Sequence, residues 1–364
     1  MTNLRRLKIT LTDRKTITAC LIILNLLSLA AIYSSLHQAG EFVGAGLLHK
    51  QIIWIAISWL FLIIFSFINY RFYFDLSYVI YGVNLFLLIA VSIFGKTIMG
   101  AQRWISIFGI TFQPSEFSKL AMIVLLARFF SQPQKNDFLK SFLLPLGLVG
   151  LNALVIFKQP DLGTALIIFF LFLAMGLASR VNKLYFVGLV ALGLIISPFA
   201  INSLQDYQKK RLMVFINPNI DPMGSGYTII QSKIAIGSGK AIGKGFLAGT
   251  QNQFNFLPER HTDFIFTVIS EEWGFIGSIF LLLIYWLILK KILQKAKNLV
   301  DPFAYFLCIG ISVLIFLHVF INIGMTLGIL PVVGLPLTFL SYGGTSLVIN
   351  FILIGIFFNI CRQK

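Results

Sequence analysis

The stretch DFIFTVISEEWGFIGSIFLLLIYWLIL (Asp263–Leu289) decides the class of fold. It is long enough to cross a bilayer, because a helix of about 20 mostly apolar residues spans the hydrocarbon core. The whole chain is similarly apolar: 58% of its 364 residues are hydrophobic, 12% are charged, and the mean hydropathy is +0.89. Soluble globular domains carry about 25% charged residues. The sequence therefore predicts an integral membrane protein.

Other apolar runs of similar length accompany this one. A lipid-exposed backbone must satisfy its own hydrogen bonds, which favours helices. We therefore predict an all-α membrane bundle of about ten transmembrane helices, forming one domain over residues 1–364 with a large extracytoplasmic loop at 203–262, between helices seven and eight. The predicted spans are roughly 17–36, 50–68, 76–94, 114–131, 141–158, 161–178, 183–202, 263–289, 302–328 and 342–361.

Lysine and arginine predict the orientation of this bundle. With a cytoplasmic N-terminus, 17 of the 29 basic residues fall in cytoplasmic segments. Seven of the other 12 lie in the loop 203–262. The positive-inside rule applies to loops of up to about 60 residues, so basic residues in a loop of this length carry little information about orientation. Both termini are therefore expected in the cytoplasm. The net charge of +16 is then mainly a topology signal, with some attraction to anionic membrane lipids. Nucleic-acid binding would need a basic surface on a soluble part of the protein, and the sequence shows none.

Cysteine and histidine usage indicates neither a disulfide framework nor a histidine metal site. The three cysteines fall in or at the ends of predicted helices, and the four histidines are scattered. His318 and Asn322 share one face of the ninth predicted helix, where we expect an interhelical hydrogen bond.

The large loop contains the basic stretch YTIIQSKIAIGSGKAIGKGF (Tyr227–Phe246). Its lysines at 233, 240 and 244 lie close to one stripe at helical spacing, which predicts a short basic helix on the membrane surface that attracts an anionic lipid. The glycines weaken this prediction. A solvated basic loop is the alternative.

Two predicted helices begin alike on the outer face, with QPSEFSKL (Gln113–Leu120) and QPDLGTAL (Gln159–Leu166). Each places proline in the first helical turn and an acid just after it, which is also ordinary chemistry for a helix start. Lys119 is different, because an ammonium in the first turn of an apolar helix is unfavourable. It lies at i+3 from Glu116, so we expect the two to pair. Charged residues inside spanning helices mark function by default.

Further outer segments carry unusual residues. Arg103 lies in GAQRWISIFG (Gly100–Gly109), just before the fourth predicted helix. The segment Gly328–Leu347 is broken by prolines and glycines, and irregular backbone at membrane depth is tolerated where it is buried in protein or lines a wet cavity. Four of the chain's 13 acids fall within residues 259–272. We expect these segments to converge on one outer cavity.

These motifs carry a family resemblance. The chain resembles the SEDS family (shape, elongation, division, sporulation) of bacterial membrane proteins from about the first helix to the C-terminus, and its elongation branch more than its division branch. The set is specific in this order: QRWI, QPSEFSKL, QPDLGTAL, PERHTDFIF with EEWGFIG, and GLPLTFLSYGGTSL. Trp273 is a small departure, since an aliphatic residue is expected there.

The resemblance implies a fold of ten spanning helices in the bacterial cytoplasmic membrane. It also implies a peptidoglycan glycosyltransferase that polymerises lipid II at the outer face during cell elongation, with a class B penicillin-binding transpeptidase as partner. By position in the motifs, the family's essential aspartate corresponds to Asp263. Its charged positions in the fourth and sixth helices correspond to Glu116, Lys119 and Asp161.

The chemistry of the residues fits this activity. The outer face of the membrane has no ATP and no nucleotide sugar, and the sequence has no phosphate-binding glycine loop of the usual kinds. A polymerase that works there needs a donor that arrives already activated, such as a sugar on a polyprenyl diphosphate. Asp263, at the border of loop and helix, can act as the base for the acceptor hydroxyl. The cations Arg103, Lys119 and Arg260 can hold the leaving diphosphate. The alternative for Asp263 is a cap of the eighth helix.

Other acids of the same stretch have several interpretations. Glu259 orients Arg260 or accepts a sugar hydroxyl. At least one of Glu271 and Glu272 is expected to make a buried structural contact or to remain protonated. A divalent cation, Mg²⁺ or Mn²⁺, between Asp263 and the diphosphate is compatible with the sequence.

Two other functions are compatible with a helical membrane bundle. A flippase of the lipid-linked precursor would also need interrupted helices with buried charges. It would need them near the midplane and in the cytoplasmic half, whereas the charges named above crowd the outer end, which favours polymerisation. A non-enzymatic scaffold leaves the outer charges unexplained.

Overall fold

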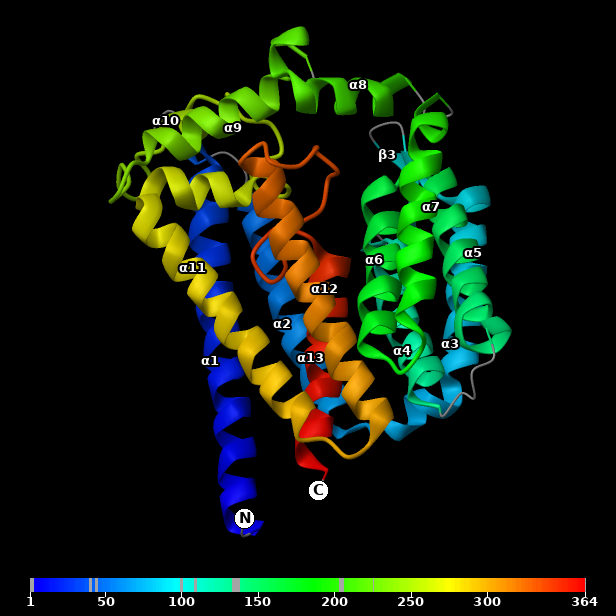
Figure 1. The fold of residues 1–364 in the computed structure, drawn as a ribbon. Helices are drawn as coiled ribbons and strands as arrows, with labels where there is room; N and C mark the ends of the chain where they lie inside the picture. Colours follow the sequence, from blue (N-terminus) through cyan, green and yellow to red (C-terminus); the bar gives the residue numbers. More distant parts are fainter. Residues whose placement is uncertain are drawn as a thin grey trace.

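The computed structural model of the protein describes most of the chain, apart from short gaps in loops and at the two ends. The described residues are 3–38, 41–42, 45–98, 101–107, 110–132, 138–202, 206–224 and 226–363. They form a bundle of long helices with short strands and small helices in the connections (Figure 1).

Within the described residues, ten long helices lie at the ten predicted places. Seven are long and apolar enough to span a membrane, and α6 and α7 are shorter apolar helices. α4 is less apolar, because its 18 residues include Glu116, Lys119 and Arg128. The prediction of a polytopic helical membrane protein is confirmed. The helices are α1 (Asn3–Ser35), α2 (Ala45–Phe67), α3 (Arg71–Phe94), α4 (Pro114–Ser131), α5 (Leu144–Lys158, after a π-turn at Leu139–Leu143), α6 (Leu162–Ala178), α7 (Lys183–Asn202), α11 (Ile265–Lys297), α12 (Pro302–Thr326) and α13 (Gly344–Arg362).

The charged helix α4 lies inside the bundle. Fifteen of its 18 residues are buried, and it packs against α3, α6 and α12. Charged side chains on such a helix avoid lipid only by facing other helices. Its position therefore keeps its charged first turn away from the membrane and beside the starts of its neighbours.

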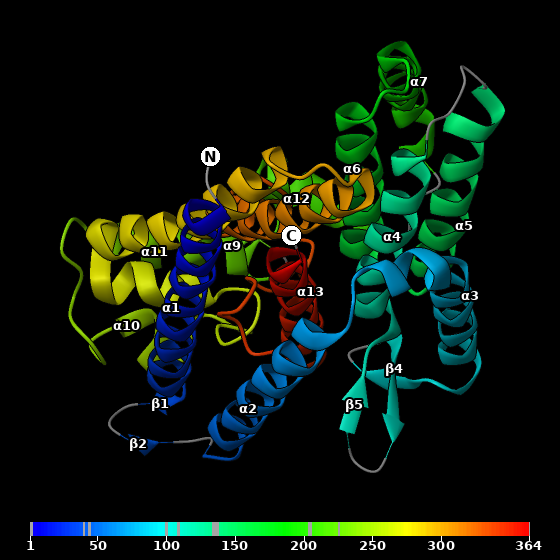
Figure 2. The same cartoon turned by 90° about the horizontal axis from the view of Figure 1, so that it is seen from below.

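Short antiparallel strands occupy two of the connections. β1 (His37–Gln38) pairs with β2 (Glu41–Phe42) after α1. Between α3 and α4 the chain forms β3 (Lys96–Ile98), β4 (Ala101–Ile107) and β5 (Ile110–Phe112), with Ile105 opposite Phe112. Figure 2 shows β4 and β5 beyond one end of α4. This hairpin carries Arg103 and places it against the turn that leads into α6.

About half of the predicted large loop is helical. It contains α8 (Asp206–Ile216), a 3₁₀ turn (Pro218–Ile220), α9 (Tyr227–Ser238) and α10 (Thr250–Gln253). The predicted basic helix exists as α9, but the predicted lysine stripe is wrong. Only Lys233 lies in α9, whereas Lys240 follows the helix with φ of 48° and Lys244 pairs with Glu271. The helix ends before Gly239, so helical spacing does not continue to the later lysines.

The two ends of the chain lie at the same end of the bundle. In Figure 1 the N- and C-termini are at the bottom, and α8, α9 and α10 are at the opposite end. An even number of crossings produces this arrangement. It agrees with the predicted large loop on one side of the membrane and both termini on the other.

Cysteine labelling tests the orientation of this bundle in the membrane. A cysteine introduced near Gly239 should react with a membrane-impermeant maleimide added outside intact spheroplasts, whereas one near Lys295 should react only after permeabilisation. The native cysteines Cys20, Cys308 and Cys361 are buried, and they should be replaced by serine for a clean background. The reverse labelling pattern would contradict the orientation.

One predicted span is two helices. The prediction of one continuous helix over 263–289 is wrong, because α11 is broken at Gly274, which has φ of 67° and ψ of −159°. The 33 residues of α11 would extend about 50 Å as one helix, against a hydrocarbon core of about 30 Å. The break divides α11 into a short outer helix (265–273) and a long spanning helix (275–297).

The break is filled by the preceding loop. Phe275 N–H donates to the Lys240 carbonyl at 2.9 Å, and Lys244 N–H donates to the Glu271 carbonyl at 3.0 Å. These bonds satisfy backbone groups that the break releases from the helix. A Cβ at Gly274 would lie 2.3 Å from the backbone nitrogen of Gly243, so only glycine allows this approach.

Candidate active site

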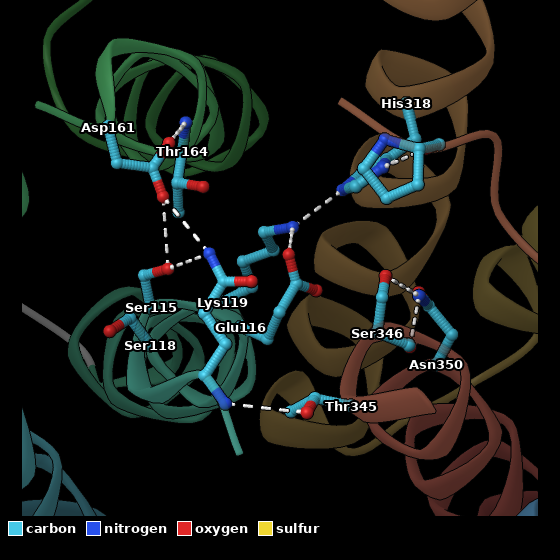
Figure 3. A network of polar contacts seen from close by, with 12 residues as sticks. Ser115, Glu116, Ser118, Lys119, Asp161, Thr164, His318, Thr345, Ser346 and Asn350 are labelled. Carbon is cyan, nitrogen blue, oxygen red and sulfur yellow. Dashed lines mark hydrogen bonds and ion pairs between the residues drawn. The ribbon is translucent and has the colours of Figure 1, made fainter. Parts of the chain in front are cut away.

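The starts of α4 and α6 meet through side chains of their first turns (Figure 3). Asp161 caps α6, because its Oδ1 accepts a hydrogen bond from Thr164 N–H at 3.2 Å. Its Oδ2 accepts from Ser115 Oγ at 3.0 Å and from Gln113 Nε2 at 3.4 Å. The capping interpretation of Asp161 therefore holds locally, and the same carboxylate also joins two helices. Pro160 precedes this cap and lies outside the first turn, contrary to the prediction.

The predicted pair of Glu116 and Lys119 is confirmed. Lys119 Nζ lies 2.6 Å from Glu116 Oε1, and both side chains are buried, with Lys119 only 1% exposed. The ammonium also lies 3.1 Å from His318 Nε2 on α12 (Figure 3). The second oxygen of Glu116 has no partner among the described residues. In this conformation Lys119 is enclosed by protein and is not open to a substrate.

Arg103 lies over the turn that leads into α6. Its Nε donates to the Gln159 carbonyl at 2.7 Å, and its Nη2 donates to the Pro160 carbonyl. The β4 strand thus anchors the backbone directly before Asp161. The guanidinium remains partly exposed, so it can face both the protein and a ligand.

Asp263 lies in the turn ahead of α11 and is partly buried. Burial is the main cause that raises the pKa of its carboxyl to about 7, and the Glu259 and Asp161 carboxylates add to this effect. Arg211 and Arg103 act in the opposite direction and lower this pKa. Four charged groups from three outer segments and α8 are therefore close enough to influence Asp263.

The alternative role of Asp263 as a helix cap is wrong. The N-cap residue of α11 is Phe264, and no side chain of the described residues caps this helix. A simple local stabilising role therefore does not explain why a carboxyl occupies this turn.

Arg211 and His318 belong to this region, although the sequence did not single them out as site residues. Arg211 is an exposed residue of α8, and its Nη1 donates to the Val332 carbonyl at 3.2 Å. The run of three basic residues at 209–211 was the available signal, but nothing in the sequence places it over Asp263. The interhelical hydrogen bond expected for His318 is present, and its partner is Lys119.

Arg260 is directed away from the other cations of the site. Its Nε donates to the Ser35 carbonyl at 2.6 Å, and its Nη1 donates to Asn255 Oδ1. Glu259 accepts instead from the Thr262 hydroxyl at 3.1 Å. Arg260 is buried, so it holds the PERHT turn against the end of α1.

Glu271 and Glu272 both make buried contacts, as expected for at least one of them. Glu271 Oε1 lies 2.7 Å from Lys244 Nζ and accepts from Gln251 N–H at 3.1 Å. Its Oε2 accepts from Asn252 Nδ2 at 3.3 Å. Glu272 accepts from the Ser34 hydroxyl of α1. Glu271 thus fastens the outer loop to α11, and Glu272 fastens α11 to α1.

The described residues contain no group of three or more histidine, cysteine or acidic side chains that could hold a metal ion. A divalent cation at this site would therefore depend on Asp263 together with oxygens of a bound diphosphate. Carboxylate and phosphate oxygens are ligands that Mg²⁺ prefers.

Comparison with known proteins places the chain among bacterial cell-wall proteins. The family described as "Cell cycle protein", which groups FtsW, RodA and SpoVE, matches residues 14–364. The chain is 40% identical to the peptidoglycan glycosyltransferase MrdB of Escherichia coli K12 over 355 residues, which cover 95% of this chain and 93% of that protein.

Solved structures have the same fold. A chain from a peptidoglycan synthase complex, described as coordinating polymerisation and crosslinking, has a TM-score of 0.80 and 30% identity over 95% of this chain and 96% of that chain. RodA of Thermus thermophilus has a TM-score of 0.71 and 26% identity, covering 95% of each chain. The chain belongs to the SEDS family of FtsW, RodA and SpoVE proteins, multi-pass proteins of the bacterial inner membrane.

Proposed function

We propose that this chain is a peptidoglycan glycosyltransferase that polymerises lipid II into glycan strands at the outer face of the cytoplasmic membrane during cell elongation. One observation carries the proposal: Asp263 is a partly buried carboxyl with a pKa of about 7, beside two arginines and at the outer end of an apolar bundle. A membrane-held sugar donor and an acceptor hydroxyl from the water can both reach this place.

The reaction needs a base and a cation. The acceptor hydroxyl oxygen forms a bond to the anomeric carbon of the donor while the bond from that carbon to the diphosphate oxygen breaks. Asp263 takes the hydroxyl proton, and the polyprenyl diphosphate leaves with the bonding electron pair. Arg103 and Arg211 are accessible cations that influence Asp263, so they can stabilise the charge on the leaving diphosphate.

The predicted substrate-binding residues divide into two groups by exposure. Arg103 and Glu259 are partly exposed and can contact the substrate. Glu116, Lys119 and Asp161 are buried and support the site from behind, and Arg260 supports the turn that carries Asp263. Glu259, close enough to raise the pKa of Asp263, is suited to accept a sugar hydroxyl.

The flippase alternative requires a charged path across the membrane. The charged groups described here are instead grouped around Asp263 and the first turns of α4 and α6. Lys291 and Asp13 form a separate pair near the opposite end, where positive charge is a topology signal. This distribution favours polymerisation.

A direct assay tests the proposal. The purified chain, alone and together with its cognate transpeptidase, is given fluorescent lipid II, and the products are separated by length on a gel. We expect a ladder of glycan strands. Transport of lipid II across vesicle membranes with no ladder under either condition would support the flippase instead.

We also propose a class B penicillin-binding transpeptidase as the partner. The support is the likeness to a chain from a synthase complex that couples polymerisation with crosslinking. Polymerised strands need crosslinks to form a wall, so a partner that uses the product at the outer face is chemically reasonable. Co-purification of the two full-length proteins from membranes tests this proposal.

The rate of synthesis should depend on pH through Asp263. A raised pKa means that the carboxyl is protonated below about pH 7, and a protonated carboxyl cannot accept the hydroxyl proton. The rate should therefore fall by about tenfold for each pH unit below 6 and level off above 8. Initial rates from pH 5 to 9 with saturating lipid II measure the profile. A flat profile across this range would contradict the role of Asp263 as base.

A further inference from the structure

Two polar residues lie one turn apart on the inner face of the apolar helix α12. His318 and Asn322 are both 0% exposed. A polar side chain buried among apolar helices needs hydrogen-bond partners, because it has lost its hydrogen bonds to water. Their partners come from three other parts of the chain.

The bonds of His318 fix which ring nitrogen carries the proton. Nδ1 lies 3.0 Å from the Pro336 carbonyl, which can only accept a hydrogen bond, so Nδ1 is the protonated nitrogen. Nε2 is then the acceptor for the Lys119 ammonium at 3.1 Å. The ring thus joins the buried pair on α4 to the irregular segment that follows α12.

Asn322 uses its amide group in a similar way. Its Nδ2 donates to the Asp263 carbonyl at 2.8 Å and to the Leu335 carbonyl at 2.7 Å. Together His318 and Asn322 hold the consecutive carbonyls of Leu335 and Pro336. One amide therefore ties this segment directly to the backbone of Asp263.

The irregular segment, residues 331–341, packs on the turn that carries Asp263. Ser341 Oγ donates to the Thr262 carbonyl at 2.6 Å, and a Cβ at Gly334 would lie 3.4 Å from Asp263 Oδ2. Gly334 has φ of 69°, which favours glycine. The position of this segment therefore limits where the carboxylate can point.

We propose that His318 and Asn322 are positioning residues for Asp263, acting through residues 331–341. The inference rests on the proposed glycosyltransferase function. Asp263 lies in a turn before the regular backbone hydrogen bonds of α11 begin, so its position depends on hydrogen bonds from other elements. A misplacement of about 1 Å at a reacting group can cost about 10²-fold in rate. The two α12 side chains should therefore affect turnover more than substrate binding.

The two bonds of His318 can be separated by substitution. In His318→Asn the amide nitrogen takes the place of Nδ1 and can still donate to the Pro336 carbonyl. In His318→Gln the amide oxygen takes the place of Nε2 and can still accept from Lys119, but the bond to Pro336 is lost. We expect His318→Asn to keep a kcat about tenfold higher than that of His318→Gln.

Asn322→Leu removes both bonds and keeps the branching and the number of heavy atoms of the side chain. We expect kcat to fall by about 10–10²-fold while KM changes by less than about threefold. Asn350→Leu is the matched control, because Asn350 is also buried, on α13, but its amide bonds the Ser346 carbonyl of its own helix. The control should change kcat by less than about threefold.

An Asp263→Asn background separates positioning from general stability. The Asp263→Asn protein has no carboxylate at this position, so a residue that acts by positioning the carboxylate should have little effect there. In this background Asn322→Leu should therefore lower the residual rate by less than about twofold. All variants are assayed as full-length protein with the partner transpeptidase and lipid II. If wild type makes no glycan, the proposed function is wrong; the outcomes below concern only the inference.

Three results would overturn the positioning role. They are His318→Gln at least as active as His318→Asn, an equal loss in Asn350→Leu, and an undiminished effect of Asn322→Leu in the Asp263→Asn background. If Asn322→Leu does not fold, the order of the two His318 variants decides.

Discussion

Asp263→Asn should lower glycan synthesis by about 10²–10⁴-fold, the usual contribution of a positioned acid or base. Asparagine keeps the size of the side chain but cannot accept a proton from the acceptor hydroxyl. Expression and lipid II binding should remain near those of wild type, since the main-chain bond from Asn322 to residue 263 is retained. Initial rates of purified variant and wild type with fluorescent lipid II measure the effect.

A matched control for this substitution is Glu259→Gln, which removes the neighbouring carboxylate from the same turn. Because Glu259 raises the pKa of Asp263, its neutralisation should shift the pH profile towards lower pH. Synthesis at pH 8 should be retained, because the glutamine amide oxygen can still accept a hydrogen bond from a sugar hydroxyl. Near-normal synthesis by a well-folded Asp263→Asn protein would remove Asp263 from the catalytic role.

Lys119→Ala should destabilise the protein by about 3–5 kcal/mol, because it leaves the Glu116 carboxylate buried without its counter-charge. The pair is separated by 2.6 Å, and Lys119 is 1% exposed, so water does not compensate for the loss. His318 also loses the donor to Nε2. We expect low protein levels and weak synthesis, measured by thermal unfolding in detergent and by the lipid II assay.

The double variant Glu116→Gln with Lys119→Met distinguishes charge balance from other effects. Replacing both partners removes the buried charges together, which is often neutral for stability. The double variant should therefore unfold at a higher temperature than Lys119→Ala. Normal protein levels and normal synthesis by Lys119→Ala would show that the pair is dispensable.

Much of the fold follows from local sequence. Apolar runs of sufficient length predict spanning helices because the bilayer imposes one length and one backbone solution. The pairing of Glu116 with Lys119 follows from their spacing, because residues three positions apart in a helix lie on the same face. The break at Gly274 was missed, since glycine is common inside spanning helices and its φ depends on the loop that packs against it.

The long-range part of the site did not follow from the sequence. Arg211 acts on Asp263 from a helix 52 positions earlier in the chain, and His318 meets a lysine 199 positions away. Arg260 follows Glu259 in the same motif, yet its guanidinium turns to the end of α1. Motif order identified the residues, but tertiary packing decides which of them face the reaction.

The broken helix α11 has a consequence for the order of assembly during synthesis. The backbone N–H groups of Lys244 and Gly245 donate to the carbonyls of Glu271 and Glu272, which leave the ribosome later. The outer loop therefore begins to cross the membrane before its hydrogen-bond acceptors reach the outer side. It can reach its final conformation only when residues 271–276 follow it to the outer side. Until the eighth predicted span enters the bilayer, the loop therefore lacks these hydrogen bonds and remains incompletely folded.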